Sequence, residues 1–242
     1  MITQNDVDSF VKWCERNLAL ASAQLPEEYY YNSLPFCVID CIYAINHEYK
    51  RPVPLVNNYC SQFTLERIRA DRNKLPIIAI QHSVSNLVKD MQAKGLNHYT
   101  NNVFRWHQSV KTGKDYKTRK EIRTLKTDII FSFAGLLCNQ NIEYFQDMPS
   151  IRHDKAFEQK ALAIKGIADR TLSYFFMLAG DDNTIKFDRW LDRNAIMVLG
   201  RKISIDDGQY LYRKACNALN APYPHMTPRL LDCVVWEFMR KI

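Results

Sequence analysis

Apolar residues recur at helical spacing through most of this chain, and that pattern limits the folds it can adopt. Behind Asn5, a residue suited to an N-cap, apolar side chains fall at i, i+3, i+4, i+7 and i+11: Val7, Phe10, Val11, Cys14 and Leu18. The stretch from Pro35 to Ile45 is nearly all apolar and too long for a typical strand, so it predicts a buried helix with Pro35 in its first turn. We expect further helices after Pro54 and over residues 76–91, 120–138, 206–219 and 230–238. No alternating strand pattern of any length appears, so the sequence predicts an all-α fold.

Glycine is scarce, with 7 residues in a chain of 242, whereas about 7% is usual. The chain has neither a GxGxxG nor a GxxxxGK[ST] pattern, so it has no recognisable dinucleotide or nucleoside-triphosphate cradle. The hydrophobic fraction of 47% is enough for a core without disulfides or structural metal. The length suits one large domain or two small ones.

The 7 cysteines are odd in number and scattered, and most lie in apolar stretches, so we expect reduced thiols in the core. Cys37 and Cys41 lie one helical turn apart, but no second pair completes a metal site. The N-terminus is polar and acidic, unlike a signal peptide, and no uncharged apolar run reaches ~18 residues. These features predict a cytoplasmic protein with no metal, no cofactor and no membrane partner.

Basic residues exceed acidic ones, giving a net charge of +7 and a pI of about 9.0, which favours a polyanionic partner. Residues 111–126 hold seven basic and two acidic side chains. Two interpretations of this run stay open. It is either a solvated loop that leads into an amphipathic helix, or a surface that follows phosphates, with Trp106 and His107 nearby to contact bases.

The most informative segment runs from Ala161 to Arg193. A helix ends near Ile164, Gly166 makes a tight turn, and a second helix runs from about residue 168 to residue 178. Asp188 stands just ahead of another helix. The segment contains two motifs. The first consists of Ile164, Lys165, Gly166, Ile167, Ala168, Asp169, Arg170 and Thr171, and the second of Ile185, Lys186, Phe187, Asp188, Leu191 and Arg193.

Together these motifs resemble those of the helix-hairpin-helix DNA glycosylase superfamily, which includes endonuclease III and the adenine and alkylpurine glycosylases. The helix that begins with Pro35 and Phe36 is similar to the first barrel helix of that family, so the resemblance spans residues 34–200. It implies a two-lobed all-α protein. A helical barrel over residues 34–186 would end in the hairpin, and residues 1–33 with 187–242 would form the second lobe, with the active cleft between the lobes.

The chain departs from the family pattern in the hairpin. Lys165 replaces the family's proline, Ala168 replaces its second glycine, and Arg170 stands where bifunctional members carry a nucleophilic lysine. No four-cysteine cluster follows Asp188, so no iron–sulfur cluster is expected.

Asp188 is the catalytic residue that the resemblance implies. Cleavage of an N-glycosidic bond gives the sugar oxocarbenium character, which a fixed carboxylate stabilises while it orients or deprotonates a water. A guanidinium stays protonated and is a poor nucleophile, so Arg170 argues for base removal without lyase activity, although Lys165 and Lys186 leave lyase chemistry open. Asp188 can also be only the N-cap of the helix after it, and the two roles are compatible.

The hairpin is expected to bind a DNA phosphate through backbone N–H groups at the start of its second helix. The DNA-binding residues implied are Lys165, Gly166, Ala168, Arg170, Thr171 and Arg193. The alternative is an ordinary joint between two helices, closed by Gly166.

A base inside a duplex must be flipped out to reach a buried carboxylate, which requires a wedge and a pocket. The resemblance places the wedge near Asn46 and His47. Possible pocket residues are Tyr31, Asp40, Tyr43 and Trp190, each of which can instead belong to the core or the surface. Asp40 is singled out because a carboxylate in an apolar helix needs a partner.

The resulting hypothesis is a monofunctional DNA glycosylase that acts on double-stranded DNA with a flipped nucleotide and needs no obligate protein partner. Its substrate would be a damaged or modified base, with a hypermodified phage base such as glucosylated hydroxymethylcytosine, removed in anti-phage defence, among the candidates. One alternative is a non-catalytic helix-hairpin-helix DNA-binding protein. Another is a helical interaction protein whose basic surface contacts RNA or an acidic protein.

Overall fold

The protein is largely helical. A computed structural model describes residues 1–45, 52–106, 108–115 and 117–242, and helix accounts for 59% of the chain. The all-α prediction is confirmed in its coarse form: the protein is mostly helical, with one small two-stranded sheet that the sequence pattern did not indicate. The expected wedge residues Asn46 and His47, and also His107, lie outside the described residues.

The chain divides into two compact units. Unit 1 comprises Met1–Pro26 and Asp181–Ile242, and unit 2 comprises Glu27–Gly180. The expected boundaries, at residues 33/34 and 186/187, lie six or seven residues later along the chain than these. The difference has a local cause at the second boundary, where Arg229 pairs with Asp182 and thereby ties the loop after residue 180 to unit 1.

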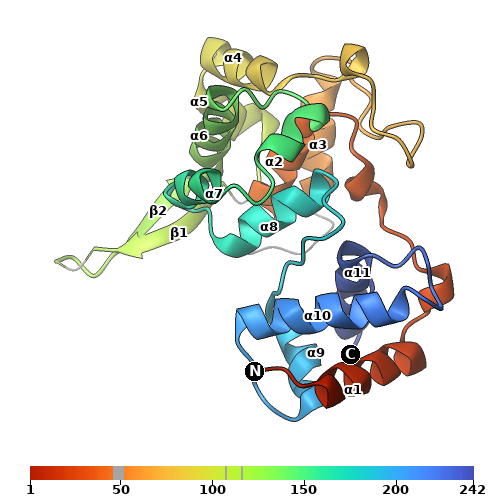
Figure 1. The fold of residues 1–242 in the computed structure, drawn as a ribbon. Coiled ribbons are helices and arrows are strands. Elements are labelled where there is room, and N and C mark those ends of the chain that lie inside the picture. The colour runs from red at the N-terminus through yellow and green to blue at the C-terminus, as the bar shows by residue number, and fades with distance from the viewer. Residues whose placement is uncertain (46–51, 107, 116) are drawn as a thin grey trace. The chain divides into compact units, whose positions relative to one another are not determined.

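Unit 1 is a helical cluster built from both ends of the chain. Helix α1 packs against α9 and α10, and α11 packs against the same two helices (Figure 1). In the core, the rings of Phe10 and Tyr212 lie 4.7 Å apart, and the buried Tyr212 hydroxyl donates a hydrogen bond to Asn194. The helices are α1 (Gln4–Asn17), η1 (Leu20–Ser22), α9 (Arg189–Leu199), α10 (Ile205–Leu219) and α11 (Pro228–Met239).

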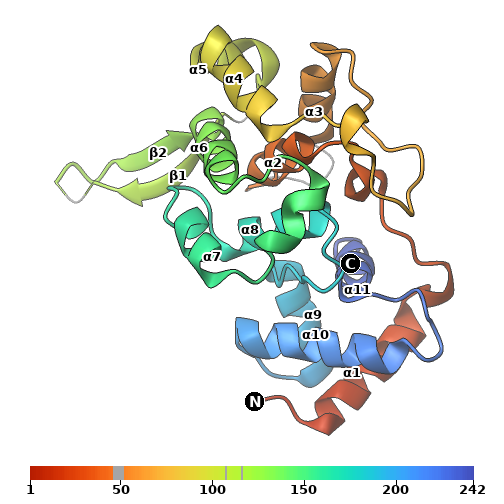
Figure 2. The ribbon, with the colours of Figure 1, turned by 45° about the horizontal axis from the view of Figure 1, so that its top comes forward.

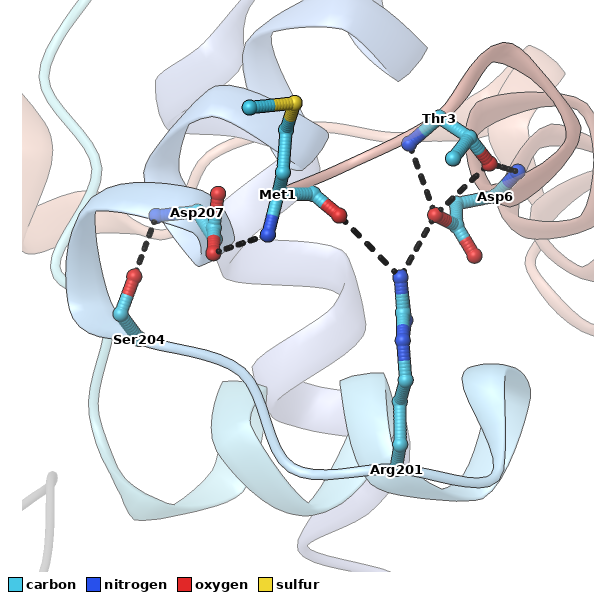
Figure 3. A network of polar contacts seen from close by, with 6 residues as sticks. All are labelled: Met1, Thr3, Asp6, Arg201, Ser204 and Asp207. Atoms are coloured by element: carbon cyan, nitrogen blue, oxygen red, sulfur yellow. Dashed lines mark hydrogen bonds and ion pairs between the residues drawn. The ribbon is translucent and has the colours of Figure 1, made fainter.

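Helix α1 begins with a capping box. The Thr3 hydroxyl accepts the Asp6 N–H, and the Asp6 carboxylate accepts the Thr3 N–H, so the N-cap is Thr3 and the prediction of Asn5 is wrong. Asp6 also pairs with Arg201 at 2.7 Å, and the Met1 amino nitrogen lies 3.1 Å from Asp207 (Figure 3). These contacts join the start of the chain to the segment between α9 and α10, through Arg201, and to the first turn of α10, through Asp207.

Unit 2 is organised around helix α2. All ten residues of α2 are buried, and it packs against α3, α6 and α8 (Figure 1). The helices of the unit are η2 (Glu27–Tyr30), α2 (Leu34–Tyr43), α3 (Pro52–Ser61), η3 (Ile78–Ile80), α4 (Val84–Lys94), α5 (Leu96–His98), the π-helical turn η4 (Tyr99–Val103), α6 (Lys126–Asn139), η5 (Phe145–Ser150), α7 (Lys155–Leu162) and α8 (Asp169–Leu178).

The sheet is an antiparallel ribbon of β1 (Ser109–Lys114) and β2 (Glu121–Leu125). Lys111 lies opposite Arg123, and the register shifts between Lys111 and Gly113. The ribbon extends away from the helices of its unit (Figure 2). The helix predicted over 120–138 is therefore wrong in its first turns: β2 occupies them, and α6 begins only at Lys126.

The helix predicted over residues 76–91 also begins too early. A single 3₁₀ turn covers Ile78–Ile80, and α4 begins after Ser83, whose hydroxyl accepts the Asn86 N–H as an N-cap. Three isoleucines in the misassigned part, Ile77, Ile78 and Ile80, are exposed.

Candidate active site and nucleic-acid interface

Asp188 is the N-cap of α9 in unit 1. Its Oδ1 accepts hydrogen bonds from the backbone N–H groups of Trp190 at 2.8 Å and Leu191 at 3.4 Å. The prediction that Asp188 stands immediately before a helix and caps it is confirmed. The cap holds the half-buried carboxylate in one orientation and engages one of its two oxygens.

The neighbouring Phe187 fixes the backbone that carries Asp188. Its buried ring contacts the Tyr212 ring edge-on, with centroids 6.0 Å apart. It also lies so close to Gly208 of α10 that a Cβ at that position would be 2.3 Å from the ring. Gly208 is thus needed for close approach, and Phe187 is held between two residues of α10.

Helix α11 also holds the loop that carries Asp188. It does so through Asp232, a residue that the sequence reasoning missed. Asp232 is 4% exposed and accepts the Lys186 N–H at 2.7 Å. Arg229, one turn earlier, pairs with Asp182 at 2.7 Å and donates its backbone N–H to the Asp182 carbonyl. The signal that could have revealed Asp232 is the one used for Asp40: a carboxylate within an apolar helical run.

Asp232 is electrostatically linked to Asp188. Burial raises the pKa of the Asp232 carboxyl well above its usual value, and the nearby negative charge of Asp188 raises it further, while the Lys186 N–H acts in the opposite direction. Burial and the charge of Asp188 thus both favour the protonated form of Asp232.

The first turns of α9 also present cations around an aromatic ring. The guanidinium carbons of Arg189 and Arg193 each lie 5.0 Å from the centroid of the half-buried Trp190 ring. Both arginines are exposed. Trp190 and Arg193, which the sequence reasoning named, therefore lie in the first turns of the helix that Asp188 caps. Arg189 was missed, although it sits between Asp188 and Trp190 in the sequence.

The expected hairpin is formed in unit 2 by α7, a tight turn and α8. Gly166 has φ +104°, which L side chains rarely adopt, and its Cα faces Ile129 and Val110. Ala168 is the N-cap of α8 and has no side chain to satisfy the first amides. The positive end of a helix such as α8 suits a phosphate oxygen.

The hairpin residues differ in exposure. Lys165, Ala168 and Arg170 are exposed, and Gly166 is half-buried. Thr171 is 9% exposed and belongs to the buried face of α8, so its predicted contact with DNA lacks an accessible side chain.

The unit 2 residues that were considered for a base pocket lie in its core. Asp40 is 1% exposed, and its Oδ2 accepts a 2.6 Å hydrogen bond from the Tyr31 hydroxyl. Tyr31 and Tyr43 are equally enclosed, and burial raises the pKa of both phenols. The partner that Asp40 needs is therefore an internal tyrosine, which favours the core interpretation over a pocket.

Lys126 is a further buried charge that the sequence reasoning did not single out. Its Nζ donates hydrogen bonds to the backbone carbonyls of Tyr43 and Ile45, each at 3.1 Å. Burial lowers the pKa of this amine to about 7. Lys126 satisfies carbonyls at the C-terminal end of α2, where a helix favours a cation.

The described part of the chain offers no group of three or more His, Cys, Asp or Glu side chains placed to hold a metal ion. The 7 cysteines are free thiols, and all but Cys138 are buried. Within the same residues, no helix combines the length and the apolar character needed to cross a bilayer.

Fold and site together define a mostly helical protein of two units, with a glycine-closed helical hairpin in one and a capped, buttressed aspartate in the other. The chain belongs to the family described as a domain of unknown function (DUF8548), whose model matches residues 8–240. No curated protein matches the sequence.

Proposed function

We propose that the protein is a monofunctional DNA glycosylase that hydrolyses the bond between a damaged or modified base and its deoxyribose. The observation that carries this proposal is the fixed carboxylate of Asp188. Capping of α9, the packing of Phe187 against Gly208 and the Asp232–Lys186 hydrogen bond all restrain the same short loop. Such restraint exceeds what a helix cap needs, and it suits a carboxylate that must meet a developing positive charge.

In the proposed reaction the C1′–N bond breaks and its electron pair leaves with the base. The Asp188 carboxylate stabilises the cationic sugar and accepts a proton from the water whose oxygen bonds to C1′. The departing base takes up one proton, and Asp188 returns the proton of the water to solvent, so the products are an abasic site and a neutral free base. Arg170 has no nucleophilic amine to offer C1′, which supports hydrolysis over strand cleavage.

Recognition of DNA is attributed to two basic surfaces. Exposed Lys165 and Arg170 flank the amides at the start of α8, and exposed Arg189 and Arg193 flank Trp190 on α9. Cations beside an aromatic ring suit a phosphate and an unstacked base.

Replacement of Asp188 tests the proposal. Duplexes with alkylated, oxidised, deaminated or mismatched bases, and phage DNA with hypermodified cytosine, would be incubated with the protein. Released bases would be identified by mass spectrometry, and abasic sites by cleavage in hot alkali. Asp188→Asn keeps a side chain that can cap α9, and we expect it to lower base release by about 100-fold or more while DNA affinity changes little.

Asp192→Asn is the matched control, because it removes the same charge from the first turn of the same helix. It should retain base release. Equal activity of the wild type and Asp188→Asn would refute the catalytic role. DNA binding without base release from any substrate would identify a non-catalytic DNA-binding protein. A covalent adduct trapped by borohydride would show that the chain has lyase activity.

A further inference from the structure

We propose that the β1–β2 ribbon is a DNA-binding arm that lies in the major groove of a duplex beside the hairpin turn. The inference rests on the DNA-binding part of the proposed function and is independent of catalysis by Asp188. It assigns a role to the basic run at residues 111–126, which the candidate active site leaves unused.

The outer half of the ribbon carries cations that its own acids do not neutralise. Glu121, the first residue of β2, pairs with Lys111 at 2.9 Å and with Arg123 at 3.2 Å. The Asp115 carboxylate stabilises the turn: its Oδ1 accepts hydrogen bonds from the N–H groups of residues 117 and 118. Toward the tip, the exposed cations that take part in no ion pair among the described residues are Lys114, Lys117, Arg119 and Lys120.

The outer part of the ribbon also buries little hydrophobic surface. Val110 is the one buried residue among the described positions of the two strands, and Ile122 is 47% exposed. A two-stranded ribbon with so little buried surface contributes little to the stability of its unit. Its paired strands, its bulge and its polar network therefore serve to present side chains to a partner.

The root of the ribbon lies against the hairpin turn. A Cβ on Gly166 would come within 3.3 Å of Val110 Cγ2, so β1 and the turn are in direct contact. Lys165, beside Gly166, is exposed. The ribbon thus begins beside the basic hairpin turn in unit 2, and it projects outward from α6 (Figure 2).

The shape of the arm favours B-form DNA. Paired strands lie about 4.8 Å apart, and the major groove of B-DNA, about 12 Å wide, admits a two-stranded ribbon. The major groove of an A-form RNA helix is too deep and narrow for such an element. Lys114 at the end of β1, and Lys117, Arg119 and Lys120 in the loop that leads to β2, would contact the phosphates that line the groove.

A triple variant tests the arm: Lys114→Gln, Lys117→Gln and Lys120→Gln in the full chain. The control triple is Lys74→Gln, Lys202→Gln and Lys241→Gln, which removes the same charge from exposed lysines elsewhere. Affinity for an undamaged DNA duplex and for an RNA duplex of the same sequence would be measured over a range of salt concentrations, with circular dichroism to verify folding. Protection of guanine N7 from methylation would report on the major groove.

For the ribbon triple we expect about a 10-fold or greater loss of DNA affinity near 0.1 M salt. The salt dependence should become shallower by about 0.9 for each phosphate that the variant no longer neutralises. N7 protection should disappear. The control triple should bind DNA within about 2-fold of the wild type, with N7 protection intact.

Three results would overturn the proposed arm. The two triple variants could lose DNA affinity equally, the ribbon triple could lose as much affinity for RNA as for DNA, or the wild type could fail to protect guanine N7. Base release measured in parallel separates the two proposals. If the wild type binds DNA through the ribbon but releases no base, the glycosylase proposal fails alone. If it releases base and the ribbon triple binds like the wild type, the arm fails alone.

Discussion

At the scale of single residues, buried charges are the most consequential features of this chain. Lys126 has no exposed surface, and its Nζ donates to two carbonyls near the end of α2. Those hydrogen bonds satisfy backbone carbonyls at the C-terminal end of α2. The cost is desolvation of an ammonium group, which lowers the pKa of Lys126 to about 7.

Lys126 should therefore make the stability of unit 2 depend on pH. Its pKa is about 7 in the folded protein and 10.5 in the unfolded chain, so between these values the unfolded chain binds more protons and stability rises with pH. Below about pH 7 Lys126 is charged in both the folded and the unfolded state, so its unfavourable contribution to the free energy of unfolding no longer changes with pH. Relative to Lys126→Met, the wild type should gain on the order of 3 kcal/mol in unfolding free energy between about pH 7 and about pH 10.

Urea unfolding of both proteins across this pH range measures the effect. The difference between the two cancels contributions from cysteine thiols, which titrate at similar pH. Parallel stability profiles would mean that Lys126 keeps an ordinary pKa.

At the scale of elements, two glycines set how segments meet. Gly208 lets the Phe187 ring lie against α10, and Gly166 lets the hairpin turn lie against α6 and β1. Both act through the absence of a Cβ, and Gly166 also through its positive φ. Each supports one half of the proposed machinery: the loop of Asp188 in unit 1, and the hairpin in unit 2.

Gly166→Ala should destabilise the protein by about 2–4 kcal/mol, because alanine disfavours the required φ and its Cβ would lie 2.4 Å from Ile129 Cδ1. Gly135→Ala is the matched control. Gly135 lies inside α6 with open space at its Cβ, and we expect a gain of about 0.5–1 kcal/mol from the better helix former. Thermal and urea unfolding distinguish the two, and a Gly166→Ala protein as stable as the wild type would contradict the packing described.

At the scale of the whole molecule, the two units differ in how the chain builds them. Unit 2 is one continuous segment, Glu27–Gly180, whereas unit 1 needs both ends of the sequence. Phe10, Cys14 and Leu20 from the first segment are almost fully buried. The early segment is therefore part of the core of unit 1.

Removal of residues 1–26 should unfold unit 1 and leave unit 2 folded. In hydrogen exchange followed by mass spectrometry, we expect amides of α9, α10 and α11 to lose protection while those of α2, α6 and α8 keep it. Removal of the exposed residues 241 and 242 is the control and should change neither. Retained protection throughout α9–α11 would show that unit 1 does not depend on α1.

Local pattern was enough for most helices and for two features of the candidate site. The cap at Asp188 and the turn at Gly166 are properties of a few consecutive residues, so the sequence predicts them. Residues 120–125 were misassigned because Ile122, Leu125 and Ile129 also fit a helical repeat. Their actual partners lie in β1, and strand pairing between separate segments leaves little trace in local spacing.

The sequence by itself determined the helical character of the chain, the hairpin turn and the position of Asp188 at the head of a helix, because spacing, capping and glycine conformation act over short range. Only the tertiary structure decided which distant groups meet. In the folded protein Asp40 accepts a hydrogen bond from Tyr31, Asp232 accepts one from the Lys186 N–H, and Val110 packs against Gly166. Desolvation and packing depend on neighbours from other segments, and those neighbours are set when the core closes.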